Sequence, residues 1–148
     1  TFLAPGDLTQ ESDLPAIGDT GLGVLTTFHY AVAHESPENK AFVEAARKAI
    51  GNPAELSFPA VGAFDGMHVI YKMIEATGGK QDARKAVEAV KGLAWESPRG
   101  PVTIDPASRH LTQNIYLREV AKAADGTFYN KEIQTFEKQP DPGLAYVK

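Results

Sequence analysis

Apolar residues recur at helical spacing through the middle of the chain, residues 36–92. Ser36-Pro37-Glu38 favours a helix start, because serine can cap, proline is tolerated at the first position and glutamate suits the positive end of the dipole. Gly51 should end this helix, and two more are expected over residues 60–77 and 82–91. The residues expected to face inward are Phe42, Ala46, Ala49 and Ile50, then Phe64, Met67, Tyr71 and Ile74, then Ala86, Val87 and Val90.

The segments on either side of these helices have the composition of β-strands, rich in Val, Ile, Thr and aromatic residues. Pro5-Gly6-Asp7 breaks the first strand, and residues 7–20 are polar and rich in turn formers. Asp125-Gly126 is a favoured hairpin turn between the last two strands. The pattern therefore predicts an α/β fold. Its expected strands are residues 2–3, 23–33, 102–104, 114–120 and 127–136.

Composition narrows the class of protein. The chain has 148 residues, of which 43% are hydrophobic and 23% charged, as in ordinary globular domains. Fifteen basic and 19 acidic residues give a net charge of −4, which offers no bulk attraction for nucleic acid. Cysteine is absent, which excludes disulfides, thiolate catalysis and cysteine zinc sites. No basic segment followed by an apolar stretch marks a signal peptide at the start, so a cytoplasmic protein, a processed one or part of a longer one all fit.

Motifs for catalysis or cofactor binding are missing. His29 and His34 are five residues apart, while His68 is expected inside a helix and His110 in a turn, so no metal-binding spacing appears. Gly21-Leu22-Gly23 precedes a strand rather than a helix, which is the wrong order for a dinucleotide fingerprint. No Gly-x-Ser-x-Gly elbow is present. The local chemistry predicts that the chain is not an enzyme and uses no cofactor or metal.

Two short segments could instead contact a ligand. Asp7 follows Pro5-Gly6 directly after a strand, and ligands of α/β sheets bind beyond the carboxyl ends of strands. Phe64 and Asp65 open the second helix, where an aromatic ring and a carboxylate could face a cleft. The plain alternatives stay open, because turn chemistry explains Asp7 and the helix dipole explains Asp65.

The order of segments resembles the periplasmic substrate-binding proteins for branched-chain amino acids and related ligands. Residues 97–120 (SPRGPVTIDPASRHLTQNIYLREV) are the most similar stretch, close to the Arg-Gly-Pro and Gln-Asn segments of many members. The resemblance covers the chain from about Gly6 to Pro142. The other matching motifs are GVLTT at 23–27, Tyr30, PENKAFV at 37–43, FDGM at 64–67, TGGK at 77–80, DGTFYN at 125–130 and IQTF at 133–136.

This resemblance implies a two-lobed fold of more than twice this length, of which the chain would be the carboxyl-terminal portion. Three helices followed by a β-hairpin would form part of a periplasmic-binding-protein-like fold that is incomplete on its own. The chain would cross between the lobes near residues 29–33 and 113–115. The implied division is residues 1–29 in the second lobe, 30–113 in the first lobe, 114–142 as a hairpin returning to the second lobe, and 143–148 as a tail.

The resemblance also implies ligand contacts. The ligand-facing acidic residue of the family falls in the Pro5-Gly6-Asp7 neighbourhood, and an ungapped match places Gly6 at that position. An α-amino acid then fits less well than in typical members, so amides and aromatic acids are also expected. The residues expected to contact ligand are Gly6, Asp7, Phe64 and Asp65.

The implied role is the solute-binding component of an ABC importer in the periplasm, which closes two lobes around a small molecule and docks on a membrane permease. A ligand-sensing regulator or receptor domain of the same fold is the first alternative. A small hydrolase using Asp7 or Asp65 with His68 is the second. Taken alone, the chain should expose apolar faces and strand edges, so we expect a homo-oligomer or a domain-swapped form with little ligand binding.

Overall fold

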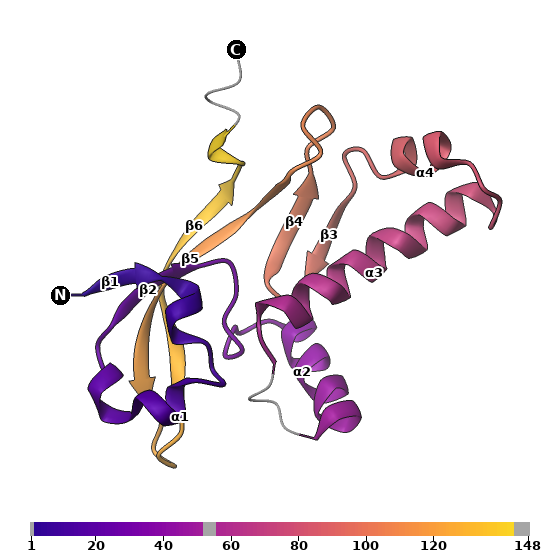
Figure 1. Cartoon of the computed structure of the whole chain (residues 1–148). Coiled ribbons are helices and arrows are strands. Elements are labelled where there is room, and N and C mark those ends of the chain that lie inside the picture. Colours follow the sequence, from indigo (N-terminus) through magenta and orange to yellow (C-terminus); the bar gives the residue numbers. More distant parts are fainter. Residues whose placement is uncertain (1, 52–55, 144–148) are drawn as a thin grey trace.

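The computed structural model describes residues 2–51 and 56–143. The chain folds around one six-stranded sheet with helices gathered mainly beside one end of it (Figure 1). The strands are β1 (Leu3–Pro5), β2 (Leu25–Phe28), β3 (Ala94–Ser97), β4 (Gly100–Ile104), β5 (Leu111–Lys122) and β6 (Phe128–Gln139). The helices are α1 (Leu14–Ile17), α2 (Pro37–Ile50), α3 (Phe58–Thr77) and α4 (Ala83–Ala89), with short 3-10 helices η1 (Gly6–Thr9) and η2 (Gly18–Gly21).

The three predicted helices are confirmed with small shifts of their ends. Ser36 caps α2, because its Oγ accepts a hydrogen bond of 3.0 Å from the backbone N–H of Asn39. Gly51 ends that helix at a positive φ of 85°, which favours glycine. Helix α3 begins at Phe58, two residues before the expected start, and Asp82 caps α4 through the backbone N–H of Lys85 at 2.9 Å.

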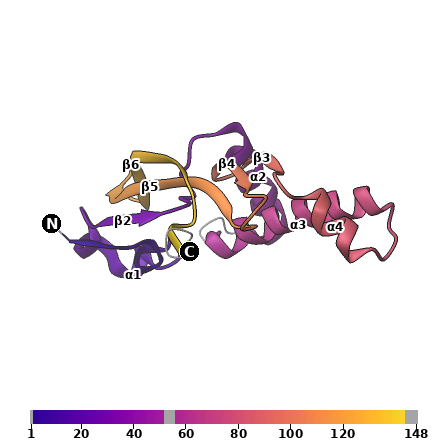
Figure 2. The same cartoon turned by 90° about the horizontal axis from the view of Figure 1, so that it is seen from above.

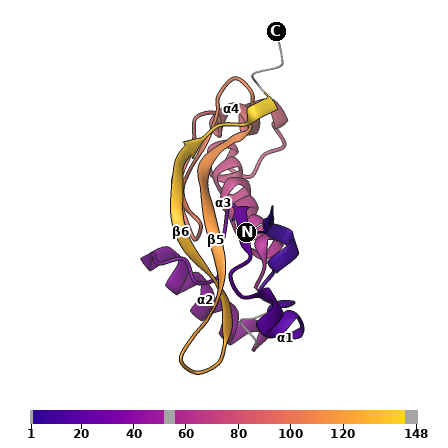
Figure 3. The ribbon, with the colours of Figure 1, turned by 90° about the vertical axis from the view of Figure 1, so that its left-hand side faces the viewer.

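The long strand β5 connects the two ends of the sheet. The strand order is β1-β2-β5-β4-β3, with β6 also paired to β5, and every pairing except β1 with β2 is antiparallel. Residues 111–113 of β5 pair with β4, whereas residues 116–119 pair with β2. Strands β5 and β6 form one long curved hairpin, which runs from top to bottom of the view in Figure 3. Its turn is the predicted Asp125-Gly126.

Two groups of elements lie on either side of the point where β5 changes its pairing from β4 to β2. Seen from above, α1, β1 and β2 gather at one end, and α2, α3, α4, β3 and β4 at the other (Figure 2). A small core of Tyr30, Phe42, Leu56 and Val61 packs where the chain passes from β2 to α2 and α3. The chain crossings near residues 29–33 and 113–115, and the assignment of each segment to a lobe, stay predictions.

Several expectations are corrected by the structure. The strand expected over residues 23–33 ends at Phe28, since the carbonyl of Tyr30 turns inward to accept a hydrogen bond from Arg118. Strand β3 and the short helices between residues 6 and 21 were not predicted, because these segments lack the length for a clear periodicity. Ala49 and Ile50 are exposed rather than inward. Gly143 is the one residue of the predicted tail, 143–148, that the structure describes; residues 144–148 lie outside it.

The apolar face of α3 lies open. Its large side chains were expected to pack inward, yet they remain 42–57% exposed. Phe64 on this face packs on Phe42 of α2, and β3 contacts the opposite side of the helix through Trp95 and Ser97. The exposed residues are Phe64, Met67, Ile70, Tyr71 and Ile74.

Candidate functional site

Three rings meet where β2 ends and α3 begins. Phe28 is the last residue of β2 and His29 follows it, with ring centroids 4.5 Å apart, and Phe58 opens α3. The Phe58 ring stands edge-on to both, with centroids 5.1 Å from Phe28 and 5.9 Å from His29. All three side chains are half-buried. We call this group the aromatic step; such edge-to-face rings offer a further aromatic ring the spacing and geometry it prefers.

Gly6 lies directly against the aromatic step. A Cβ atom on Gly6 would overlap the ring of Phe28, so no larger residue fits here without displacing that ring. Phe28 thus occupies the space into which a side chain at position 6 would project. The contact with Phe28 therefore explains why position 6 holds a glycine where the family resemblance led us to expect an acidic residue.

Arg118 is a buried cation that packs against the Phe28 ring of the aromatic step. Its guanidinium donates hydrogen bonds to the carbonyls of Tyr30 (2.6 Å) and Gly6 (2.8 Å) and to Thr26 Oγ1 (3.1 Å). Its Cζ atom is 5.0 Å from the centroid of the Phe28 ring, within cation–π range. None of the ion pairs among the described residues includes Arg118, and burial lowers its pKa. Glu11 and Glu132 act on it in the opposite direction, so carboxylates with which it forms no ion pair offset part of its charge.

Asp65 of α3 is held by three side chains of β3 and the turn that follows it. Its Oδ2 accepts hydrogen bonds from Arg99 Nε (2.8 Å) and Ser97 Oγ (2.9 Å), and its Oδ1 accepts one from Trp95 Nε1 (3.0 Å). Arg99 in turn donates to Gln113 Oε1 at 2.6 Å. Both Asp65 and Arg99 are buried, so this group fastens α3 to the turn between β3 and β4.

His29 is neutral in this setting. Burial first, and then the cations Arg99 and Arg118, lower its pKa to about 4 against a raising effect of Asp65. The hydrogen bonds among the described residues leave both of its ring nitrogens unused. Every fully buried side-chain nitrogen or oxygen in the described chain has a partner, so the nitrogens of His29 must reach solvent.

The four residues predicted from the sequence fall in different surroundings. Gly6 lies against the aromatic step, and Asp7 follows it as an exposed residue of η1. Asp65 is engaged by the buried partners described above. Phe64 is 50% exposed and packs edgewise on Phe42 of α2, at 5.1 Å between centroids. Their roles as ligand contacts stay predictions.

Sequence reasoning missed Phe28, His29 and Phe58. A usable signal was present, because an aromatic run directly follows a strand and a phenylalanine follows Ser57, the residue before a helix. The hydrolase alternative loses its premise, since none of the hydrogen bonds in the described chain joins Asp7 or Asp65 to His68. His68 instead stacks on Trp95 at 5.1 Å.

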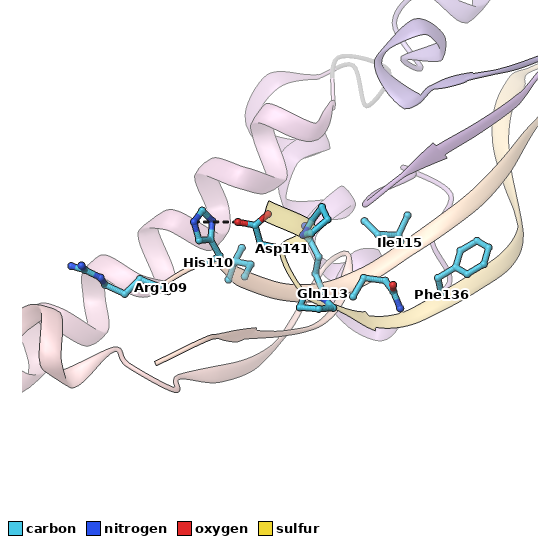
Figure 4. Close-up of a pocket in the computed structure, with 10 residues that line it drawn as sticks. Arg109, His110, Gln113, Ile115, Phe136 and Asp141 are labelled. Carbon is cyan, nitrogen blue, oxygen red and sulfur yellow. Dashed lines mark ion pairs between the residues drawn. The ribbon is translucent and has the colours of Figure 1, made fainter. Parts of the chain in front are cut away.

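Two surface hollows lie away from the aromatic step. One of about 700 Å³ lies between the start of β5 and the end of β6, where His110 and Asp141 point toward each other at 3.3 Å (Figure 4). The other, about 770 Å³, is lined by Val43 of α2 and by Phe128 and Tyr129 beside the hairpin turn. Within residues 2–51 and 56–143, no group of three metal-ligating side chains converges. No helix in the same residues has the length and apolarity to cross a membrane.

Comparison with known proteins identifies the family. The profile of the Periplasmic binding protein family matches residues 1–127. The Leu/Ile/Val-binding protein homolog 6 of Brucella abortus (strain 2308) is 84% identical over 143 residues, which are 97% of this chain and 37% of that protein. The chain thus spans little more than a third of the length of this relative.

Solved structures show the same partial overlap. A solute binding protein of an ABC transporter from Rhodopseudomonas palustris HaA2, in complex with p-hydroxybenzoic acid, is 55% identical with a TM-score of 0.95. A second, from Rhodopseudomonas palustris BisB5 with 3,4-dihydroxybenzoic acid, is 45% identical with a TM-score of 0.88. They overlap 98% and 96% of this chain, and 39% and 38% of their own. The chain belongs to the periplasmic binding protein family and forms part of its fold.

Proposed function

We propose that the chain is part of the solute-binding component of an ABC importer. The family match and the two solute binding proteins that share its fold support this role. In such a protein two lobes close around a small molecule in the periplasm, and the closed form docks on a membrane permease. The binding step needs no covalent chemistry and no cofactor.

The ligand class that the geometry favours is an aromatic carboxylic acid. The observation that carries this proposal is the aromatic step packed against the buried Arg118, which forms no ion pair among the described residues. Phe28 and Phe58 offer faces and edges to a ligand ring, while the cation favours a negative charge nearby. The hydroxybenzoic acids bound by two relatives belong to this class.

A branched-chain amino acid is the second candidate, suggested by the name of the Brucella relative. Its ammonium group would need a carboxylate, and Asp7 is the exposed one beside Gly6. Asp65 serves this purpose poorly, because its two oxygens already accept three hydrogen bonds.

Calorimetry on the full-length binding protein, meaning a polypeptide that contains this chain and spans the length of its relatives, tests the ligand class. We expect 4-hydroxybenzoate and benzoate to release heat with micromolar affinity and leucine and leucine amide to give none. Binding of leucine with silence from both aromatic acids would contradict the proposal.

Uptake of labelled 4-hydroxybenzoate by cells with and without this protein separates an importer from a sensor. An importer component is required for uptake, whereas a ligand-sensing domain of the same fold leaves uptake unchanged in its absence.

A further inference from the structure

His29 is the one side chain of the aromatic step with unused hydrogen-bonding groups. Its imidazole lies 4.5 Å from Phe28 and 5.9 Å from Phe58 between ring centroids, and its nitrogens reach solvent. A ligand ring seated against either phenylalanine would therefore lie within reach of the imidazole. A neutral imidazole has one N–H donor and one acceptor nitrogen.

The charges around His29 decide which ligand group belongs there. Arg99 and Arg118 act on it as cations, and Asp65 is the opposing anion. Asp65 is already paired with Arg99, and Glu11 and Glu132, which offset part of the charge of Arg118, are not among the charges that act on His29. The surplus is positive, and an anionic ligand group is favoured over a neutral one at this place.

Arg118 itself is a poor direct contact. It is 1% exposed, and its Nε and both terminal nitrogens already donate to Thr26, Tyr30 and Gly6. It supplies positive potential, while the donor that meets the ligand must come from a neighbour with a free N–H. His29 is the neighbour that has one.

We propose that the imidazole N–H of His29 donates a hydrogen bond to the carboxylate of the aromatic acid. This inference rests on the proposed function and names the group that recognises the acid end of the ligand. The ring of the ligand packs on Phe28 and Phe58, and Arg118 stabilises its negative charge from below. His29 thereby selects aromatic acids against their neutral amides.

The experiment uses the full-length binding protein and titrates 4-hydroxybenzoate, benzoate and 4-hydroxybenzamide into the wild type, His29→Phe and His29→Gln. We expect His29→Phe to weaken both acids by a similar factor of about 10 to 100, the range for one hydrogen bond to a charged group. The affinity for 4-hydroxybenzamide should be the same in His29→Phe as in the wild type. His29→Gln retains an N–H donor and should lose less than His29→Phe.

His68→Gln is the matched control, because His68 of α3 stacks on Trp95 of β3 and takes no part in the aromatic step. Thermal unfolding of each variant checks that it folds. A loss confined to 4-hydroxybenzoate would overturn the proposal, since His29 would then bind the ring hydroxyl. Equal affinities in wild type and His29→Phe would overturn it as well. A wild type that binds no aromatic acid would overturn the proposed function and this inference together.

Discussion

Arg118 Nη2 donates a 2.8 Å hydrogen bond to the carbonyl oxygen of Gly6, across 112 residues of sequence. The same guanidinium binds the carbonyl of Tyr30, where the chain leaves β2 for the helices. One side chain of β5 therefore holds both the end of β1 and the segment that passes between the two groups of elements. Since the Phe28 ring packs against both Gly6 and the guanidinium, this contact also helps to fix the aromatic step.

Replacing this guanidinium should destabilise the protein strongly. Arg118→Met leaves the buried carbonyls of Gly6 and Tyr30 without a donor, which costs about 1–3 kcal/mol each. We expect a loss of about 3 kcal/mol in the free energy of unfolding of the full-length protein, measured by urea denaturation. Arg84→Met on the exposed face of α4 is the control and should change stability by less than about 0.5 kcal/mol. Equal stability of the two variants would contradict the assigned role.

The contact of Gly6 with Phe28 makes a second prediction. Gly6→Ala introduces a methyl group where the phenylalanine ring lies, and overpacking of this kind costs about 1–3 kcal/mol. We expect a lower melting temperature and weaker binding of aromatic acids. Gly6→Ala combined with Phe28→Ala should cost less than the sum of the single variants, because the second removes the clash.

Gly62→Ala is the matched control for this substitution, since a methyl group there meets no atom within 4 Å. It lies inside α3, where alanine is the better helix former, so stability should stay the same or rise. A Gly6→Ala protein as stable as Gly62→Ala would show that the Phe28 ring moves aside freely.

Asp65 should prove structural rather than dispensable. Asp65→Asn leaves the buried Arg99 without its counter-ion, and breaking a buried pair in this way costs about 3–5 kcal/mol. Urea denaturation should show that loss. Glu44→Gln, which removes an exposed ion pair with Lys48, should cost at most about 1 kcal/mol. If Asp65→Asn unfolds at the same urea concentration as Glu44→Gln, the pair with Arg99 contributes little.

The lowered pKa of His29 predicts a pH dependence of stability. The unfolded chain titrates this group near the ordinary value of about 6.5 and the folded protein near 4, so between these values the unfolded state binds the extra proton. The contribution is fully present above pH 6.5 and is lost as the pH falls toward 4. It amounts to about 2 kcal/mol after allowance for the solvent that still reaches the ring.

Melting temperatures of the full-length wild type and His29→Gln over pH 4–8 measure this effect. The wild type should lose more stability than the variant below pH 6.5, and the two curves should run parallel above it. Parallel curves over the whole range would mean that His29 titrates normally in the folded protein.

Local sequence signals predicted the elements that depend on local physics. Ser36 and Gly51 set the ends of α2, and Asp125-Gly126 set the hairpin turn, because capping and turn chemistry act within a few residues. The aromatic step could not be derived in this way. Its geometry depends on Arg118 reaching back to Gly6, a contact between segments whose pairing no local pattern records. Asp65 shows the same limit, since its partners lie about 30 residues away on β3 and the turn that follows.

The open face of α3 predicts how the chain behaves on its own. Phe64, Ile70 and Ile74 are about half exposed along one helix, and a contiguous apolar surface of this kind drives association in water. In the two-lobed fold of the relatives, the remaining length of polypeptide is the expected cover. We therefore expect the isolated chain to form homo-oligomers in light scattering coupled to size exclusion. Ile70→Glu with Ile74→Glu should shift it toward monomer, whereas Lys85→Glu on the exposed part of α4 should not. A monomeric wild-type chain at micromolar concentration would show that this face is stable in contact with water.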